Sequence, residues 1–350
     1  MNSNQLPLSI LKNTRSPAMK KALVTGAAGF IGSHVVRELL KENVEVRAMV
    51  RPGEPLANLS GLEIETVQAD ILNQAAVQEA VNGVDAVFHL AAVYSIWMKD
   101  WRTIYEVNIQ GSRNVLWAAL KTGTPKVVYT SSIAAIGTSP GKQLSNEKTP
   151  FNQYNCGNHY VLTKYLSQQE ALGFAQNSLD LVIVNPCFPF GENDIAPTPT
   201  GKSILDVVSG LARFQYKGGI NIVDVNDVAR GHILAAKKGK TGELYILGNK
   251  NLTMEEFIRT VNRIAGFPNR KLPKLPVAVL KAGTSVLKSW SDHISHKPPL
   301  STPAEIQYTS QYLFFDITKA KTELGLELSP IEASIEKSIQ WFRRNGYLKK

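Results

Sequence analysis

Three glycines stand three residues apart directly after a short apolar run, in the segment TGAAGFIGSH at 25–34. Glycine is required where the backbone takes a positive φ, or where another group comes closer than a Cβ would allow. The run at 22–24 has the composition of a buried strand, and the apolar positions after the glycines have the spacing of an amphipathic helix. The segment therefore restricts this part of the chain to a strand, a tight turn and a helix.

Each glycine has a separate task in this arrangement. We expect Gly26 to end the strand in a tight turn, Gly29 to let a pyrophosphate lie against the backbone, and Gly32 to let the helix pack closely on the strand. The free amides of the first helical turn, near Phe30 and Ile31, would then face the phosphates together with the positive end of the helix dipole. The pattern predicts a dinucleotide-binding turn.

Strand-like apolar runs alternate with helix-like stretches over the first half of the chain. This alternation is typical of a parallel sheet with helices on both faces, and it predicts an α/β fold with a doubly wound, Rossmann-type sheet. The predicted strands lie at 21–25, 44–50, 64–68, 85–90, 126–130 and 181–185.

The alternation ends near Pro186, after which the pattern is mixed. Residues 19–187 are expected to form the dinucleotide-binding domain, together with about 221–237, where a strand followed by a helix would return to the sheet. A smaller, mixed C-terminal lid at about 188–220 and 238–350 would bind the substrate, and the polar residues 1–18 would form a flexible tail. The lid is predicted to contain a strand at 243–248 and helices at 253–265, 274–290 and 329–345.

The net charge limits the partners without choosing one. Lysine and arginine number 39 against 29 aspartate and glutamate residues, which gives a formal charge of +10 and suits an anionic partner of any kind. Because the basic residues are scattered and lack the aromatic interleaving of single-strand binders, we expect no nucleic-acid partner. The histidine, cysteine and carboxylate positions lack close metal-ligand spacing, so no metal is expected.

Cysteine usage and hydropathy indicate the compartment. Only Cys156 and Cys187 occur, and no signal-peptide pattern precedes them, so we expect no disulfide framework and a cytoplasmic protein. No run approaches the roughly 20 apolar residues of a membrane span. The segment 276–290 predicts an amphipathic helix that covers part of the core, with peripheral membrane contact as the alternative.

The residue after the second predicted strand indicates which cofactor is bound. An acidic side chain at this position would bind the ribose hydroxyls of NAD, whereas here VRAMVRP places Arg51 at the strand end. A guanidinium suits the 2′-phosphate through two parallel hydrogen bonds. The sequence therefore favours NADP(H), with NAD(H) as the alternative.

The segment YVLTK provides a candidate catalytic pair. It places Tyr160 and Lys164 four residues apart, on one face of a helix. A tyrosine titrates near 10, so its use in proton transfer at neutral pH needs a neighbouring cation, which Lys164 can supply. The segment YTSSIAAIG at 129–137 adds hydroxyl groups at the end of the fifth predicted strand, about thirty residues earlier.

These segments, with VNPCFPFGENDIAPTPTG, NIVDVNDVARGH and GELYILGNKNLT further along the chain, resemble the extended branch of the short-chain dehydrogenase/reductase superfamily, of the NAD-dependent epimerase/dehydratase type. The resemblance covers nearly all of 19–348. Within that family the chain is most similar to dihydroflavonol 4-reductase-like proteins and to the group called hopanoid-associated sugar epimerases.

The resemblance implies roles for further residues. The family's serine pattern selects Ser132 as the hydroxyl that binds the substrate carbonyl, with Ser131 as the fallback, and completes a Ser-Tyr-Lys site with Tyr160 and Lys164. Asn108 would brace the catalytic loop, while His89 packs. Helices at 102–120 and 157–176 would form the interface of a homodimer. The cofactor would also contact Asp70 and Ile71 near the adenine, Ala91 after the fourth strand, and Pro186 near the nicotinamide.

Three functions remain open at this level. The first is an NADP(H)-dependent reductase that converts a ketone to an alcohol on a small, hydrophobic or anionic substrate, which Arg51 favours. The second is an NAD-dependent epimerase or dehydratase that keeps its cofactor bound and acts on a nucleotide sugar. The third is a cofactor-sensing scaffold without catalysis. Fold resemblance alone does not choose among them.

Overall fold

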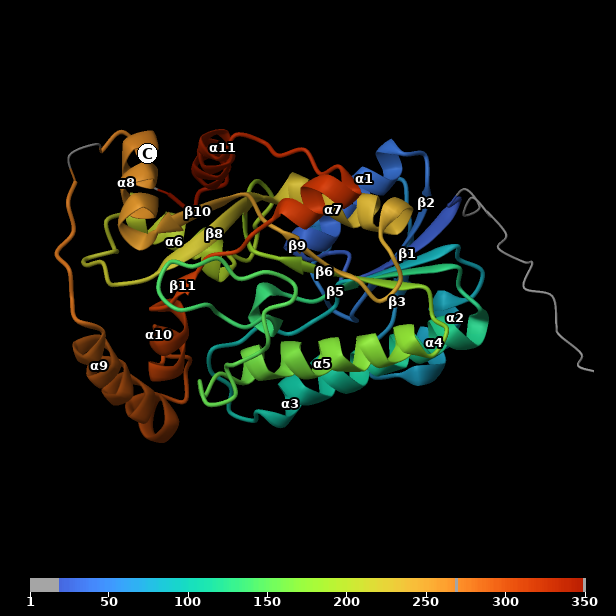
Figure 1. Ribbon diagram of the computed structural model, residues 1–350, viewed down its shortest axis with the longest axis horizontal. Coiled ribbons are helices and arrows are strands. Elements are labelled where there is room, and N and C mark those ends of the chain that lie inside the picture. Colours follow the sequence, from blue (N-terminus) through green and yellow to red (C-terminus); the bar gives the residue numbers. More distant parts are fainter. Residues whose placement is uncertain (1–18, 268–269, 349–350) are drawn as a thin grey trace, which may run out of the picture.

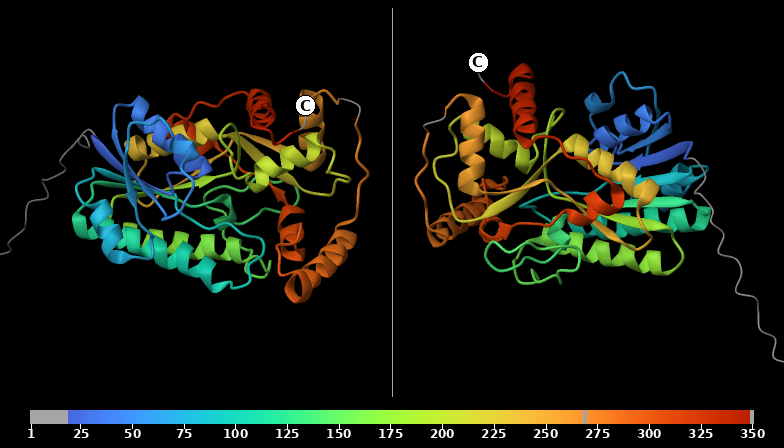
Figure 2. Two further views of the ribbon diagram at one scale, coloured as in Figure 1. Left: turned by 180° about the vertical axis from the view of Figure 1, so that it is seen from behind. Right: turned by 45° about the horizontal axis from the view of Figure 1, so that its top comes forward.

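The computed structural model describes residues 19–267 and 270–348, and it divides into a large and a small unit (Figure 1). The predicted tail at 1–18 lies outside the described residues. Figure 2 shows the orange helices of the small unit at the end of the molecule opposite to the blue segment that follows residue 19. None of the described helices is long and apolar enough to cross a membrane.

The large unit contains a seven-stranded sheet in the order β3-β2-β1-β4-β5-β6-β9, with every neighbouring pair parallel. The predicted doubly wound sheet is thus confirmed. Parallel strands are joined by crossovers, so their ends of one kind share one edge of the sheet. The strands are β1 (Lys21–Thr25), β2 (Glu45–Val50), β3 (Glu65–Gln68), β4 (Ala86–His89), β5 (Lys126–Thr130), β6 (Leu181–Pro186) and β9 (Leu244–Leu247).

Helices cover both faces of this sheet because its strands are apolar on both faces. In β1, Ala22 and Val24 belong to the core beneath α1 and α7, whereas Leu23 belongs to the core beneath α2, α4 and α5. Figure 1 shows α4 and α5 side by side along the second face. The helices are α1 (Phe30–Lys41), α2 (Gln74–Val81), α4 (Ser112–Thr122), α5 (His159–Gln176) and α7 (Val225–Lys238).

The small unit is built around β8 (Gly219–Asp224), which pairs with β7, β10 and β11. Its separate core contains Phe190, Ile222, Phe257 and Phe342, all buried. The remaining elements are β7 (Phe188–Phe190), β10 (Lys250–Thr253), β11 (Tyr312–Leu313), α6 (Pro199–Val208), α8 (Met254–Ala265), α9 (Val277–Trp290), α10 (Pro303–Thr309) and α11 (Ile331–Arg344).

Two segments lie in a different sheet from the one that the sequence indicated. The strand within 221–236 was expected to return to the large sheet, which is wrong: β8 lies in the small sheet, and only the following helix α7 packs on the large one. Conversely, the strand predicted at 243–248 is β9, the last strand of the large sheet. Both strands are short and apolar, so their composition fits either sheet equally well. The division into two domains at the expected boundaries stays a prediction.

The two helices expected to form a dimer interface differ from uniform helices. Residues 102–122 form the short helix α3 (Arg102–Tyr105), a π-helical segment at Glu106–Gly111 and then α4. The outer surface between α4 and α5 has a groove that includes Trp117 and Leu166, both exposed. This surface suits the expected homodimer, which stays a prediction.

The turn from β1 to α1 is tightly packed. Gly26 has φ +66°, and a Cβ there would lie 2.8 Å from the amide nitrogen of Ala91. A Cβ at Gly32 would overlap the carbonyl oxygen of Gly26. The helix can therefore approach the strand end only because both positions lack a side chain.

We predict opposite effects for two alanine substitutions inside helices. Gly32→Ala should lower the free energy of unfolding by roughly 1–3 kcal/mol because the added methyl forces α1 away from the turn. As a control, the methyl group of Gly283→Ala in α9 meets no atom within 4 Å in the described part of the chain outside its own helix backbone, so this change should raise the free energy of unfolding by about 0.5–1 kcal/mol through helix propensity. Urea unfolding measures both. A Gly32→Ala protein as stable as wild type would contradict the packing argument.

Candidate active site

The residues expected to bind the cofactor lie along one edge of the large sheet. Each follows or ends a parallel strand at its carboxyl end, and the strand order reverses between β1 and β4, which is where ligands of such sheets bind. The sites are Gly26 after β1, Arg51 after β2, Asp70 and Ile71 after β3, Ala91 after β4, and Pro186 at the end of β6.

The first turn of α1 faces this edge without a side-chain cap. Gly29 is the N-cap residue, in an extended conformation, and no side chain of the described residues caps the helix. Among the described residues other than its chain neighbours, a Cβ at Gly29 would approach only the Gly26 carbonyl oxygen within 4 Å, at 3.2 Å. The amides of Phe30, Ile31 and Gly32 therefore begin the helix beside a bare stretch of backbone, an arrangement that suits an anion.

A buried hydrogen-bond chain holds the neighbouring turn after β4. The Thr25 hydroxyl accepts from the amide of Ala91 at 3.2 Å and lies 2.7 Å from Nδ1 of His89, whose Nε2 lies 2.9 Å from the Ser112 hydroxyl. Burial, with a smaller contribution from the Lys164 charge, lowers the pKa of His89 to about 3. His89 is therefore neutral and holds the turn in place, as a packing residue does.

Arg51 and Arg47 have different environments. Arg51 is exposed, its amide donates to the Glu54 carboxylate at 3.0 Å, and its guanidinium forms no ion pair within the described ranges. Arg47, by contrast, is bound to Glu65 at 2.8 Å and to the Ala80 carbonyl at 2.8 Å. Of the two arginines, Arg51 is the one whose guanidinium is available to a ligand at the sheet edge.

Asp70 and Ile71 lie in the turn after β3. One carboxylate oxygen of Asp70 accepts from the Leu72 amide at 2.8 Å, which fixes the turn. Ile71 is 7% exposed, and its side chain fills the space that a Cβ at Gly111 would occupy. These contacts bring the turn after β3 against the π-helical segment that leads into α4.

The three candidate catalytic residues meet where α5 packs on the end of β5. Tyr160 lies in the first turn of α5, which Asn158 caps by accepting from the Val161 amide at 3.2 Å. One turn later, Lys164 is 4% exposed and donates from Nζ to the carbonyl of Thr130, the last residue of β5, at 2.9 Å. Ser132 follows two residues after Thr130 and accepts from an amide of its own loop at 3.1 Å.

The two candidate serines differ in where they point. The hydroxyl of Ser132 interacts with Tyr160, and this interaction lowers the tyrosine pKa. Ser131 is 4% exposed, and its hydroxyl has no hydrogen-bond partner in the described part of the chain. The structure therefore brings Ser132 rather than the fallback Ser131 to the tyrosine.

Burial governs the protonation of the pair on α5. It raises the pKa of Tyr160 to about 12, against the opposing effect of the Ser132 hydroxyl, and it lowers the pKa of Lys164 to about 8. The lysine was expected to lower the tyrosine pKa, but its ammonium is directed to the Thr130 carbonyl. Tyr160 is thus protonated at neutral pH, the form that can donate a proton.

Asn108 links two segments near the tyrosine. Its side-chain oxygen accepts from the Val93 amide at 2.7 Å, and its nitrogen donates to the Val93 carbonyl at 2.9 Å and to the Thr163 hydroxyl at 3.1 Å. These bonds join the π-helical segment, the loop after β4 and α5. The bracing position implied by the family resemblance is thus the one that Asn108 occupies.

Sequence reasoning missed two tyrosines around Tyr160. The ring of Tyr94 meets that of Tyr160 edge-on at 4.7 Å between centroids. Burial raises the pKa of Tyr308, on α10, and Tyr160 adds to this shift. These residues come from a loop and from the small unit, and no spacing in the sequence connects them with α5. They give the proposed substrate side an aromatic wall.

The buried ammonium leads to a prediction about stability. Lys164 forms no ion pair among the described residues, so its burial opposes folding while it is charged. Lys164→Met should raise the free energy of unfolding by up to about 3 kcal/mol below pH 8, where the wild-type lysine is charged in both states. The gain should shrink between pH 8 and 10.5, because the folded-state lysine is then neutral.

Urea unfolding across this pH range measures the effect. The exposed residue Lys121 on α4 provides the control, because Lys121→Met should show no such pH dependence. A gain for Lys164→Met that does not vary with pH would contradict the buried charge.

Comparison with known proteins places this geometry in a family. Residues 22–248 match the model of the NAD dependent epimerase/dehydratase family. A putative dihydroflavonol 4-reductase of Synechocystis sp. is 38% identical over 93% of this chain and 95% of its own length. Sterol demethylase protein B of Methylococcus capsulatus is 30% identical over 93% of this chain and 99% of its own length.

A solved structure has the same architecture. The crystal structure of a nucleoside-diphosphate-sugar epimerase from Pseudomonas aeruginosa aligns with a TM-score of 0.78 and 26% identity, over 94% of this chain and 99% of that one. The family match covers most of the chain, and the similarity to relatives extends over nearly all of it. This protein therefore belongs to the NAD dependent epimerase/dehydratase family, as an NAD(P)-dependent enzyme of the extended short-chain dehydrogenase/reductase type.

Proposed function

We propose that this protein is an NADP(H)-dependent reductase that converts a ketone to an alcohol. The observation that carries the proposal is the meeting of Ser132, a protonated Tyr160 and the buried Lys164 at the carboxyl edge of the sheet. The names of the relatives support it, since a putative dihydroflavonol 4-reductase is among them and a cinnamoyl-CoA reductase of Arabidopsis thaliana is 29% identical.

The cofactor would lie along the sheet edge, where the residues present fit its chemistry. The uncapped amides of Phe30, Ile31 and Gly32 suit the pyrophosphate beside the bare backbone of Gly29, and the guanidinium of Arg51 suits a 2′-phosphate. Toward the adenine, Asp70 and Ile71 would form the contacts. Toward the nicotinamide, the contacts would come from Ala91, Pro186, Tyr160 and Lys164.

The chain's own residues would then perform the proton chemistry. When bound, the reduced nicotinamide supplies the hydride that the carbonyl carbon accepts. Ser132 would donate a hydrogen bond to the carbonyl oxygen and hold it, and Tyr160 would transfer its phenolic proton to that oxygen as charge develops. Lys164 would hold this part of α5 on the end of β5 through the Thr130 carbonyl, and Asn108 would keep α5 in position through its bond to Thr163.

The end of β2 favours the reductase over the epimerase alternative. The exposed guanidinium of Arg51 favours NADP(H) over a permanently bound NAD(H). The resemblance to a nucleotide-sugar epimerase supports the shared fold and cofactor site. A non-catalytic scaffold would have no use for the complete set of Ser132, Tyr160 and Lys164.

The surroundings of Tyr160 suggest the class of substrate. Tyr94 and Tyr308 border the tyrosine, and Glu305 on α10 lies near enough to raise the pKa of Tyr94 further, after burial. An aromatic wall with one carboxyl group suits a largely apolar small molecule that carries a ketone. The sterol demethylase protein among the relatives is consistent with such a substrate.

Removing the proton donor tests the mechanism. Tyr160→Phe should lower kcat by at least about 100-fold with any ketone that the wild type reduces, because the proton transfer is lost, while the Kd for NADPH stays within a factor of about three. NADPH consumption and fluorescence titration measure the two quantities. Tyr165→Phe, one turn along α5, is the control because its hydroxyl bonds only to Tyr154 among the described residues. Turnover retained by Tyr160→Phe would exclude the tyrosine.

Reversing the charge at the end of β2 tests the cofactor. Arg51→Asp should weaken NADPH binding about 10- to 100-fold, the loss expected for hydrogen bonds to a charged group. NADH binding should change by no more than about threefold, because NADH lacks the 2′-phosphate. The control is Arg213→Asp, at another exposed arginine far along the chain. Equal losses for the two cofactors would rule out the 2′-phosphate contact.

A further inference from the structure

Helix α9 and the π-helical turn that continues it, Ser291–Ser295, expose an apolar stripe. Within α9 only Leu280 and Thr284 are buried, so the helix does not cover the core as expected. The stripe is defined by five side chains that are between 42% and 70% exposed, namely Val279, Val286, Leu287, Trp290 and Ile294. Their spacing of seven, one, three and four residues places them on one face of a helix.

Such a stripe is unusual on a free surface. Single exposed apolar residues are normal, but a contiguous row of large ones marks a contact surface. The row includes a tryptophan, a residue that favours the boundary between lipid and water. A further large apolar side chain, Leu300, is 80% exposed a few residues after the stripe. The stripe therefore indicates a contact surface for an apolar partner.

The charge of the segment that contains α9 indicates what kind of partner binds there. Residues 270–300 contain six basic residues and one acidic residue, so this segment carries a net charge of +5, half of the +10 of the whole chain. Lys288 is paired with that acidic residue, Asp292, at 2.5 Å. The excess positive charge of this segment attracts an anionic surface that lies within a Debye length of it. An apolar row within a strongly basic segment matches an anionic lipid bilayer.

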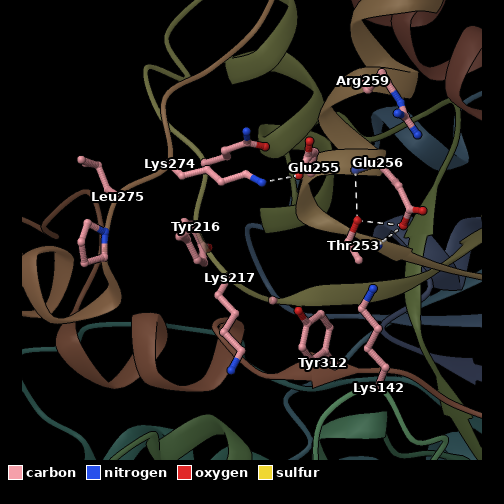
Figure 3. A pocket seen from close by; sticks show the side chains of 13 residues that line it. Lys142, Tyr216, Lys217, Thr253, Glu255, Glu256, Arg259, Lys274, Leu275 and Tyr312 are labelled. Carbon is pink, nitrogen blue, oxygen red and sulfur yellow. Dashed lines mark hydrogen bonds and ion pairs between the residues drawn. The ribbon is translucent and has the colours of Figure 1, made fainter.

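A basic pocket adjoins the start of the same helix (Figure 3). It has a volume of about 650 Å³, and Leu275 and Pro276, which precede α9, lie in its wall. Lys142, Lys217 and Arg259 line it as well, and Lys274 forms an ion pair there with Glu255 at 2.7 Å. Glu256 also lines the pocket, which leaves two more basic than acidic residues and extends the positive surface beyond the start of α9.

Another face of the helix that carries the stripe lies close to the catalytic residues. The indole of Trp97, in the loop after β4, donates to Asp292 at 2.7 Å, and the Lys288 charge adds to the burial that lowers the pKa of His159, next to Tyr160. Helix α9 packs on α10, which carries Tyr308, and Figure 1 shows both helices at one corner of the molecule. A surface bound to α9 would therefore lie beside the substrate side of Tyr160.

We propose that α9 and the turn at 291–295 dock this protein on an anionic membrane surface, with the apolar stripe inserted at the lipid boundary. Fourteen residues of helix span about 21 Å, less than the roughly 30 Å of a bilayer core, so the helix lies in the plane of the surface. The docking stands independently of the reaction. That an apolar ketone enters from the bilayer rests on the proposed function.

Vesicle binding tests the docking without any turnover. The wild type should sediment with vesicles of phosphatidylcholine and phosphatidylglycerol, and much less with phosphatidylcholine alone, and added salt should release it. Val286→Ser combined with Trp290→Ser should reduce binding at least about tenfold, because two inserted side chains are lost. The control is Leu211→Ser, which removes a leucine that is 67% exposed outside the stripe.

Three further measurements separate the outcomes. NADPH titration and thermal unfolding show that the double variant is folded, and brominated lipid should quench wild-type fluorescence in a way that Trp290→Phe abolishes. Failure of the wild type to bind the anionic vesicles, or equal binding by the double variant, would overturn the proposal. So would a wild-type oligomer that the double variant converts to a monomer, because a second copy would then cover the stripe.

Discussion

The geometry of the site depends on the hydrogen bond between the Lys164 ammonium and the Thr130 carbonyl. This bond ties the first half of α5 to the end of β5, so that Tyr160, one turn earlier, lies against Ser132 just beyond the strand. The ammonium is buried without a carboxylate among the described residues, an arrangement that opposes folding. A cation kept in place against stability is typical of a functional site.

The same burial sets the protonation of nearby groups. It holds Tyr160 in the protonated form, ready to donate to an oxygen that gains negative charge, and it leaves the neighbouring His89 neutral. The glycines in the turn after β1 carry no charge and act on the backbone geometry. Gly26 and Gly32 let α1 approach the strand end, where its first amides face the sheet edge. The exposed guanidinium of Arg51 lies at the same edge, after β2.

Much of the fold and of the cofactor edge could be predicted from the sequence because both depend on local patterns. Strands β1 and β5 begin and end at the predicted residues, and the other large-sheet strands agree to within one or two residues. A residue that follows a parallel strand must lie at the shared edge, so the position of Arg51 followed from the strand pattern, whereas Asp70 and Ala91 were indicated by the family resemblance. Tyr160 and Lys164 were indicated by their spacing on one helix, and Ser132, after the end of β5, by the family resemblance.

The rest depends on contacts between distant segments. Tyr94 approaches Tyr160 from a loop and Tyr308 from the small unit. The sequence around each of these tyrosines does not indicate this proximity. The place of β8 in the small sheet was not predicted, because its partner strands are distant in the sequence and its composition fits either sheet. Likewise, α9 has the pattern of a core-covering helix, and only packing shows that its apolar face is left exposed.

The most direct test of the central claim is the identity of the nucleotide that the purified protein holds, and how readily it leaves. Mass spectrometry of the denatured protein, followed by titration of the native protein with NADPH and NADH, measures both. An NADP(H)-dependent reductase should release its cofactor on gel filtration and then bind NADPH more tightly than NADH. Stoichiometric NAD that stays bound through purification would contradict this account and favour an epimerase.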